Sequence, residues 1–450
     1  MSQVGGRRTR AVGIGDAFSS LRGNRPFQRL WLSNVFFFGG VWTQTLVLGW
    51  MAYEMTDSEF LVAVFTAARL APMLLGPFAG ALADRHDRVR LLMVACGWAT
   101  VALSLVAAFA TAGLLSYWGL VAGGLAIGLA QSPSQPARAS LALTLVGPAR
   151  LSNANALNAL ALNTTQIVGP SLGGLLIATI GAPGALWVST LWYVLSLLLI
   201  VSLRGYGERA KTVPEPVLRM VVGGLRSIGR NRPAVAVLLV TLAANVLLWP
   251  IYQSFMPVFA EEVLHLDARG LGLLLTCSGV GGLLGSLFIA SLGDFRGKGA
   301  LFVFGTATWG LLWAVFSSIQ HAPTAFVVMT LVGLAGSAFG VLQTTLLLTT
   351  TEPAVHGRAL GLQELAIGVM PLSTLVLGAI AERAGVGATT FVAALILVAF
   401  LLVLVLRVPA LARLGAPVEN PDGGSRAGDE DPSPDTRPHT EHPASQGGTE

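Results

Sequence analysis

The sequence has few charged residues for its length. Only 11% of its 450 residues are charged, whereas 53% are hydrophobic and the mean hydropathy is +0.69. A soluble domain of this size needs a far more polar surface, so the composition excludes a soluble protein. Strands of a membrane barrel would alternate apolar and polar residues, and the long unbroken apolar runs do not. The composition therefore predicts an all-α membrane protein with several spans.

Residue types that carry chemistry are also scarce. The two cysteines, Cys96 and Cys277, each lie inside an apolar run, so neither a disulfide framework nor a metal site is indicated. The six histidines lie outside the apolar runs, and no cluster of catalytic residue types occurs at one depth. We therefore expect no enzyme and no cofactor. The polar, Arg-rich segment Met1–Arg25 has no apolar core of its own, so no cleavable signal peptide is expected.

The apolar runs have the length that a helix needs to cross a bilayer, about 20 residues. They predict twelve transmembrane helices. The predicted segments are Phe27–Tyr53, Phe60–Ala83, Leu91–Ala112, Tyr117–Pro136, Ala154–Ile180, Pro183–Leu203, Ala234–Phe259, Gly270–Leu292, Ala300–Ile319, Ala325–Thr350, Ala359–Ala381 and Val386–Val408.

The positions of the basic residues support this division. Of the 28 Lys and Arg residues, all but Arg69, Arg269 and Arg383 fall on one side of the predicted membrane. Cytoplasmic loops collect Lys and Arg. This side is therefore predicted to be the inner one, with both termini in the cytoplasm, and the opposite side is called the predicted outer side below.

The predicted segments fall into two sets of six, separated by a linker with seven bases. The tail is rich in Gly, Pro and Ser, which is typical of disorder. The predicted domains are a cytoplasmic arm at 1–26, a six-helix bundle at 27–203, a cytoplasmic linker at 204–233, a second six-helix bundle at 234–408 and a disordered tail at 409–450.

A charged motif occurs once in each set of six. GPFAGALADRHDRVRLL at 76–92 ends the second predicted helix, and a shorter form, ASLGDFRGKGAL, places Asp294 at the corresponding point, 210 positions after Asp84. Glycines four apart allow close helix packing, and an Asp with nearby Arg residues can form charge-assisted bonds. A parallel repeat of six helices is a recurring transporter plan with substrate bound between the halves. Loop anchoring by bases explains the Arg residues but not the paired Asp and Gly.

These residues resemble the signature loop of the major facilitator superfamily, although Asp87 stands where that loop has a glycine. The resemblance covers about Arg22–Leu411 and implies the major facilitator fold, two pseudo-symmetric bundles of six helices. It also implies an inner gate whose breakage accompanies exchange between outward-facing and inward-facing states. The predicted inner-gate residues are Gly76, Gly80, Asp84, Arg85, Arg88, Asp294, Arg296 and Lys298.

Further stretches resemble one branch of the superfamily. GGVWTQTLVLGWMAYEMTDS, WPIYQSFMPVFAEEVLHLDARGLGLLL and LVGPARLSNANAL are similar to enterobactin exporters and macrolide-efflux-like proteins, which implies export. The fifth predicted helix carries the core of a motif that resembles the one found in antiporters of the superfamily, formed by Gly169, Pro170, Gly173 and Gly174. A proline kink with small-residue packing is the alternative interpretation.

Two ionisable residues lie within predicted spans, where a charge costs about 2.5–3.5 kcal/mol on insertion scales. Arg69 shares a helix stripe with Met73 and is expected to face protein. It either attracts an anionic group of the substrate or steers a proton path, or it bonds backbone carbonyls of a neighbouring helix. Glu364 is either a proton carrier or a member of the inner gate. Their depths differ by more than a side chain's reach, so a direct pair is not expected.

Uncharged polar residues are predicted to line a central cavity. They are Asn34, Gln44, Asn163, Gln166, Asn245, Gln253 and Gln343. Trp42, Trp50, Trp249 and Tyr252 are candidates for stacking on a flat ligand, although packing is the commoner role of such residues. Pro250 and Pro257 are expected to break the helical ladder of the seventh span, as suits a gating helix.

The sequence thus predicts a secondary active transporter, proton-coupled, that exports a small amphipathic drug or siderophore-like compound across a bacterial plasma membrane. An importer or uniporter of a small metabolite, and a nontransporting receptor or channel, are the alternatives. Its expected partners are a small-molecule substrate, protons and the lipid bilayer, with no nucleic acid, and it is expected to function as a monomer.

Overall fold

The computed structural model describes residues 20–21, 23–75, 86–147, 150–207, 223, 226, 228–293, 295–352 and 355–414. All of these residues lie in one compact unit, Met1–Gly415. Within the described ranges the chain forms helices and no strand, which confirms the predicted all-α class.

The helices of the first half begin at capping residues that precede apolar runs. The side chains of Asn24, Ser58, Asp87 and Ser116 each accept a hydrogen bond from a backbone N–H three residues further on. Such caps satisfy donors that the helix itself leaves free. The elements are α2 (Arg25–Glu54), α3 (Glu59–Leu70), the 3₁₀ helix η1 (Ala71–Leu75), α5 (Arg88–Thr111), α6 (Tyr117–Gln131), α7 (Ser134–Val146) and α8 (Leu151–Val201).

The second half starts at Asn231, which caps α10, and Asp267 caps α12 in the same way. Its elements are α10 (Arg232–Leu247), the π-helix η3 (Ile251–Phe255), α11 (Met256–Val258), the π-helix η4 (Phe259–Val263), α12 (Ala268–Ser291), α13 (Lys298–Phe316), α14 (Ala322–Thr350), α15 (His356–Gly368), α16 (Met370–Ala384), α17 (Val386–Arg407) and the 3₁₀ helix η6 (Pro409–Leu411).

Nine helices among the described residues are long and apolar enough to cross a membrane. One of them is interrupted, because Gly181 in α8 has φ 75° and ψ 167°, outside the helical region. The sequence predicts a helix break at this point. Glycine adopts a positive φ without steric cost, so it permits the sharp turn that the chain makes there.

Two proline-containing regions behave differently from each other. Pro250 and Pro257 flank or occupy the π-helical stretch between α10 and η4, which confirms the predicted break in the ladder. The predicted end of the fourth segment at Pro136 is wrong, because α7 continues to Val146. Pro136 occupies the first turn of α7, where a missing N–H costs no helical hydrogen bond.

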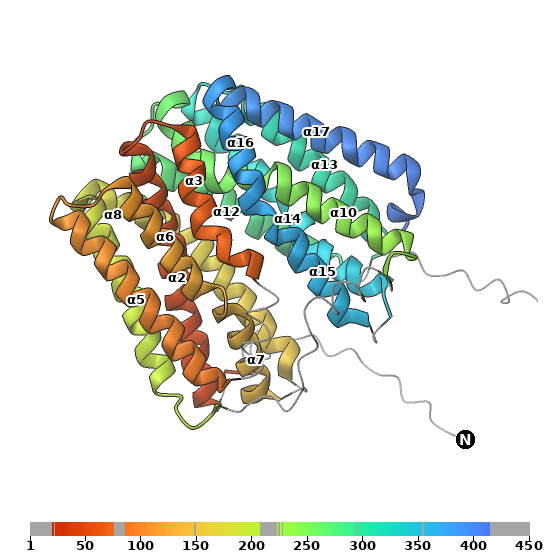
Figure 1. The fold of residues 1–450 in the computed structure, drawn as a ribbon. Coiled ribbons are helices and arrows are strands. Elements are labelled where there is room, and N and C mark those ends of the chain that lie inside the picture. The colour runs from red at the N-terminus through yellow and green to blue at the C-terminus, as the bar shows by residue number, and fades with distance from the viewer. Residues whose placement is uncertain are drawn as a thin grey trace, which may run out of the picture. The chain divides into compact units, whose positions relative to one another are not determined.

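The helices gather in two groups (Figure 1). α2, α5, α6, α7 and α8 pack with one another, and α10, α13, α14 and α17 form a second group. The larger hydrophobic core takes side chains from both groups, whereas a second core lies wholly in the first half, around Phe27, Leu92 and Leu141. The first half therefore has a core of its own at the predicted inner ends of its helices.

Candidate functional site

The two halves meet most closely where α8 packs against α12. A Cβ added at Gly272 of α12 would lie 2.7 Å from the carbonyl oxygen of Pro170 and 3.3 Å from the Cα of Gly174. A Cβ at Gly174 would overlap the backbone of Ala268. Small residues allow such an approach between helix backbones. This contact between α8 and α12, around Gly174 and Gly272, is called the glycine seam below.

The four motif residues of the fifth predicted span lie in α8 and face two different neighbouring helices. Gly174 and the carbonyl of Pro170 face α12 in the second half. Gly169 and Gly173 face α2 in the first half, where a Cβ at Gly169 would lie 2.5 Å from Cβ of Trp42. The small residues of the motif therefore allow α8 to pack closely against α2 in the first half and against α12 in the second half. The motif thus lies at the junction between the halves.

Several hydrogen bonds between described residues of the two halves lie at the predicted outer ends of the helices and at mid-depth. Tyr53 Oη of α2 donates to Glu262 Oε1 of η4 at 2.5 Å. Ser58 Oγ and the backbone N–H of Phe60 donate to Glu382 Oε2 of α16, at 2.9 and 3.0 Å. Thr276 Oγ1 donates to the carbonyl of Ile167, about midway along α8, at 3.2 Å. The bonds made by Tyr53, Ser58 and Phe60 are called the outer clasp below.

Glu59 adds a titratable group to the outer clasp. It lies just before the predicted membrane segment Phe60–Ala83, and its carboxyl is hydrogen-bonded to that of Glu382. Burial raises the pKa of Glu59, and the negative charges of Glu262 and Glu382 raise this pKa further. A carboxyl–carboxylate bond needs one proton, so this contact between the halves depends on protonation. The run of acids without bases at Glu54–Glu59 is the sequence signal that could have indicated it.

A small pocket lies between the halves beside the glycine seam. It has a volume of about 30 Å³, room for a water-sized molecule, and takes its walls from α2, α8, η3, α11 and α12. Trp42, Pro170, Tyr252 and Gln253 are among its lining residues. Tyr252 also contacts Trp249 edge-to-face, with ring centroids 5.8 Å apart.

Of the other polar residues predicted to line a cavity, Gln166 is hydrogen-bonded to the side chain of Tyr252, a lining residue of this pocket, and the rest are not among its lining residues. Asn34 is buried in the first half, Asn245 is buried and donates to the carbonyl of Thr241, and Asn163, Gln166 and Gln343 are half-buried. Gln44 of α2 is fully buried, and neither atom of its amide has a hydrogen-bond partner in the part of the chain that the structure describes. Such an amide is costly when left unbonded. Gln44 is thus a polar group that a bound molecule or a different conformation could satisfy.

Arg69 and Glu364, the two predicted ionisable residues, lie in different surroundings. Arg69 is only 5% exposed, which agrees with its expected protein-facing stripe, and its Nη1 donates to Thr45 Oγ1 at 3.1 Å. Glu364 lies on α15, and its side chain is exposed. No hydrogen bond joins Glu364 to the side chains that the structure describes, and none joins it to Arg69.

A third ionisable residue, Arg138 of α7, escaped the sequence analysis. It is 2% exposed, and its guanidinium donates to Ser33 Oγ, Asn34 Oδ1, Cys96 Sγ and Ser196 Oγ. The ring of Phe37 lies 4.2 Å from Cζ. No carboxylate of the described ranges bonds to it. Because the fourth predicted span ends at Pro136, the sequence predicts Arg138 in a basic loop. The continuation of α7 to Val146 is what places Arg138 in a helix and turns it toward the interior.

The predicted inner gate is described only in part. Gly76, Gly80, Asp84, Arg85 and Asp294 lie outside the described residues. Arg88 donates to Thr144 Oγ1 of α7 at 2.5 Å, which ties α5 to α7 within the first half. Arg296 is exposed and Lys298 is half-buried. The gate interpretation therefore stays a prediction.

The comparisons with known proteins agree with this arrangement. Residues 16–420 match the family described as "transmembrane secretion effector", and the chain belongs to this family of the major facilitator superfamily. This confirms the resemblance seen in the sequence. The chain is therefore a multi-pass membrane protein of a transporter family.

Three relatives have names that describe transport. The chain is 27% identical to "Multidrug efflux pump Tap" of Mycolicibacterium fortuitum over 355 residues, which cover 76% of this chain and 85% of that protein. It is 27% identical to "Enterobactin exporter EntS" of Shigella flexneri over 312 residues, 68% and 73% of the two chains. It is 21% identical to "Staphyloferrin A transporter" of Staphylococcus aureus over 368 residues, 79% and 89%.

Solved structures share the fold at low sequence identity. A POT family transporter in complex with a thioalcohol-conjugated peptide superposes with a TM-score of 0.72 at 11% identity, covering 86% of this chain and 96% of that one. The nucleoside transporter NupG superposes with a TM-score of 0.69 at 13% identity, covering 86% and 100%. These similarities show the fold alone.

Proposed function

We propose that this protein is a secondary active transporter that exports a small amphipathic compound, drug-like or siderophore-like, from the bacterial cytoplasm. The names of the relatives support efflux. The proposed architecture is twelve transmembrane helices in two pseudo-symmetric bundles, at 27–203 and 234–408, in a monomer with both termini in the cytoplasm. The arm at 1–26, the linker at 204–233 and the tail at 409–450 lie on the same side. The basic residues on the predicted inner side support this orientation.

The observation that carries the proposal is the junction that described residues of the two halves form on the predicted outer side. The glycine seam and the outer clasp join the halves on the predicted outer side. On the predicted inner side, the first half keeps a separate core. A transporter that alternates between two openings needs halves that separate on one side while they close on the other. The junction supports a state closed to the outside and open to the cytoplasm.

In this proposal the described and predicted residues have distinct roles. Substrate enters from the cytoplasm toward the aromatic and amide groups near Trp42, Tyr252 and Gln253. The inner-gate residues close the opposite side when the outer clasp opens. Arg69 and Glu364 belong to the path of protons or substrate. Glu364 is favoured as the proton carrier, because its exposed carboxylate on α15 is not held by a described partner.

The experiment compares Glu364→Gln with the wild-type protein in proteoliposomes, with a lipophilic cationic dye and a catechol siderophore as probes. We expect uphill, proton-driven movement to fall to the level of empty liposomes, while exchange of labelled for unlabelled probe persists. A glutamine side chain has nearly the same shape as glutamate, but its amide cannot bind and release a proton. Glu352→Gln, an exposed acid at the end of α14, is the matched control and is expected to leave both activities unchanged.

Other outcomes would favour the alternative functions. Unchanged proton dependence in Glu364→Gln would remove this residue from the coupling path. Uphill accumulation toward the predicted inner side would identify an importer, and downhill movement alone would identify a uniporter. A receptor or a channel would show no counterflow, because counterflow needs a site that alternates between the two sides.

A further inference from the structure

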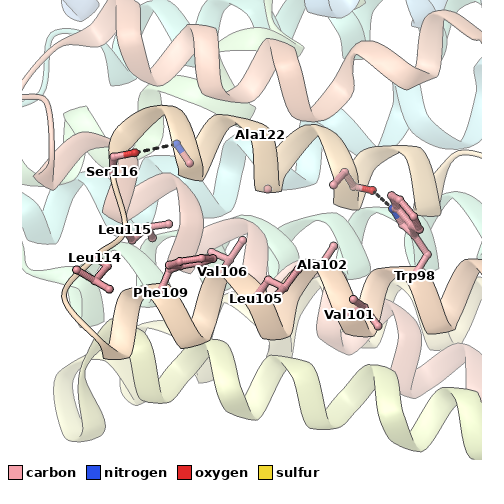
Figure 2. A pocket seen from close by; sticks show the side chains of 13 residues that line it. Trp98, Val101, Ala102, Leu105, Val106, Phe109, Leu114, Leu115, Ser116 and Ala122 are labelled. Carbon is pink, nitrogen blue, oxygen red and sulfur yellow. Dashed lines mark hydrogen bonds between the residues drawn. The ribbon is translucent and has the colours of Figure 1, made fainter.

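An apolar groove runs along the surface of the first half, between α5 and α6 (Figure 2). Its volume is about 450 Å³. One wall is a helical stripe of α5, formed by Trp98, Val101, Ala102, Leu105, Val106 and Phe109. The facing wall is a stripe of small residues on α6, formed by Gly119, Ala122, Gly123 and Ala126. Large residues opposite small ones leave a channel instead of a flat helix pair.

The two helices touch at the floor of the groove. A Cβ added at Gly123 would overlap Val106, so the helix backbones cannot come closer at this level. Above the contact the side chains of Val101, Leu105 and Phe109 remain more than half exposed. The space between the stripes is thus open toward the surroundings of the protein, which at this depth are the hydrocarbon of the membrane.

The polar atoms at both ends of the groove already have partners. At one end Trp98 Nε1 donates to the carbonyl of Ala126 at 2.8 Å. At the other end Ser116 Oγ accepts from the backbone N–H of Gly119 at 3.2 Å. A pocket for a drug-like compound usually presents a few convergent polar groups to its ligand. Along its length the groove is lined by apolar side chains, and only Ser116 at the mouth presents a hydroxyl, so its chemistry fits plain hydrocarbon.

The length of the groove matches one leaflet of a bilayer. Trp98 and Phe109 are eleven residues apart on α5, about 16 Å at 1.5 Å per residue. Half of a typical hydrocarbon core of about 30 Å is nearly the same distance. The mouth at Leu114–Ser116 lies beside Tyr117 and Trp118, and Trp118 is 66% exposed. Aromatic residues of this kind mark the interface between hydrocarbon and headgroups.

We propose that this groove is a binding site for one acyl chain of a membrane phospholipid. The headgroup lies at the mouth beside Ser116 and Trp118, and the chain end lies over the Trp98 indole at mid-depth. The chain fills the space that the small stripe of α6 leaves open, and so completes the packing of α5 against α6. The assignment of this leaflet to the outside rests on the orientation proposed above, whereas the site itself does not.

The test uses phosphatidylcholine that carries a photoreactive diazirine on one acyl chain, incorporated with the full-length protein in nanodiscs. With the diazirine at the chain end, we expect crosslinks to concentrate at Trp98–Ala102. With the diazirine near the ester, we expect them at Phe109–Ser116. Peptide mass spectrometry locates both. Labelling spread evenly over the exposed apolar residues of all helices, or the same for both probes, would overturn the proposal.

Ala122→Trp places a large side chain in the groove, and Ala122 is exposed, so the protein interior is not disturbed. The indole occupies the space of the acyl chain, and the displaced chain returns to the bilayer hydrocarbon, so packing contacts are lost. We expect labelling of the groove residues by the chain-end probe to fall to the level of the other exposed apolar residues. Leu129→Trp on the same helix lies outside the groove and is the matched control. Unchanged labelling in Ala122→Trp would contradict the proposal.

Two further arms keep the result interpretable. Gly119→Leu narrows the mouth from a second position and is expected to reduce labelling by the ester-proximal probe, if Ala122→Trp does not fold. An exported compound that protects the groove from labelling would show that the site takes substrate, and would also overturn the proposal. The transport assay in proteoliposomes, by contrast, tests only the proposed function. If the protein did not transport either probe compound, the expected labelling pattern of the groove would be the same.

Discussion

At the scale of single residues, the most unusual group is the buried guanidinium of Arg138. A cation inside a membrane protein is expensive unless its donors are bonded. Here four uncharged acceptors and the face of Phe37 surround it, and no carboxylate of the described ranges takes part. The positive charge of Arg138 therefore holds α2, α5, α7 and α8 together through neutral partners.

Arg138→Leu is expected to destabilise the first half. It leaves Asn34 Oδ1 without its donor, and a buried polar group left unbonded costs about 1–3 kcal/mol. Ser33 and Ser196 lose one bond each but stay hydrogen-bonded to each other. Thermal unfolding of the purified protein and the rate at which Cys96 reacts with a maleimide measure the effect. We expect a lower unfolding temperature and faster labelling of Cys96.

Arg296→Leu is the control, because Arg296 is exposed. Equal unfolding temperatures for Arg138→Leu and Arg296→Leu would show that the guanidinium contributes nothing to stability. Arg138→Lys separates charge from geometry. An ammonium is a point charge with three donors and cannot match the fork of a guanidinium, so only partial rescue is expected.

At the scale of elements, the pairing of α8 with α12 decides how closely the halves approach. Gly272 contacts the carbonyl of Pro170, and this backbone contact leaves no space for a side chain. The neighbouring seventh span is broken into π-helical turns around Met256–Val258. The π-helical turns allow the seventh span to change its conformation, while the glycine seam keeps the distance between α8 and α12 fixed.

Gly272→Leu is expected to prevent closure on the predicted outer side and to abolish transport. Overpacking costs about 1–3 kcal/mol, which lowers the population of the closed state by about five- to 150-fold. Spin labels at Met55 and Arg383, both exposed at the outer ends of α2 and α16, report the separation of the halves. We expect the longer distance to dominate in the variant.

Gly340→Leu in α14 is the matched control, because a Cβ at Gly340 meets no atom within 4 Å. It should keep the wild-type distance distribution and the wild-type transport rate. An unchanged distribution in Gly272→Leu would mean that the glycine seam does not control closure.

At the scale of the whole molecule, the two halves are connected by contacts that respond to pH. Glu59 is hydrogen-bonded to Glu382 across the junction, and burial raises the pKa of Glu59. When the halves separate on that side, Glu59 returns to water and to its ordinary pKa of about 4.3. The closed state therefore binds a proton that the open state releases.

The sign of the pH dependence follows from this difference. The stabilisation that the proton gives to the closed state is fully present below the ordinary pKa of Glu59, and it is lost as the pH rises through the raised pKa. We expect the spin-label pair at Met55 and Arg383 to show less of the shorter distance as the pH rises from about 4 to about 8.

Glu59→Gln should remove most of this dependence, because an amide can donate to Glu382 at any pH. Glu54→Gln, an exposed acid on the same side, should retain it. An opposite trend, with the closed state gaining population at high pH, would contradict the role given to Glu59.

Much of the fold could be predicted from local patterns. Gly181 ends one span because only glycine turns there without strain, and Pro250 and Pro257 interrupt another because they lack a backbone N–H. The same logic failed at Pro136, where the first turn of α7 tolerates proline and the helix carries Arg138 inward. Residue type and depth can be read along the chain, whereas the sequence does not show which side of a helix meets which neighbour.

The sequence by itself determined that the chain is an all-α membrane protein, because apolar run length and charge position are local properties of the chain. Its likeness to the major facilitator superfamily rested on the motif at 76–92 and the shorter form around Asp294. Only the tertiary structure decided which residues face each other across the halves. Glu382 accepts a hydrogen bond from Ser58, 324 positions away along the chain, and Gly272 of α12 packs against the carbonyl of Pro170 in α8 of the other half. Such contacts depend on how helices rotate and pack, which hydropathy along the chain does not specify.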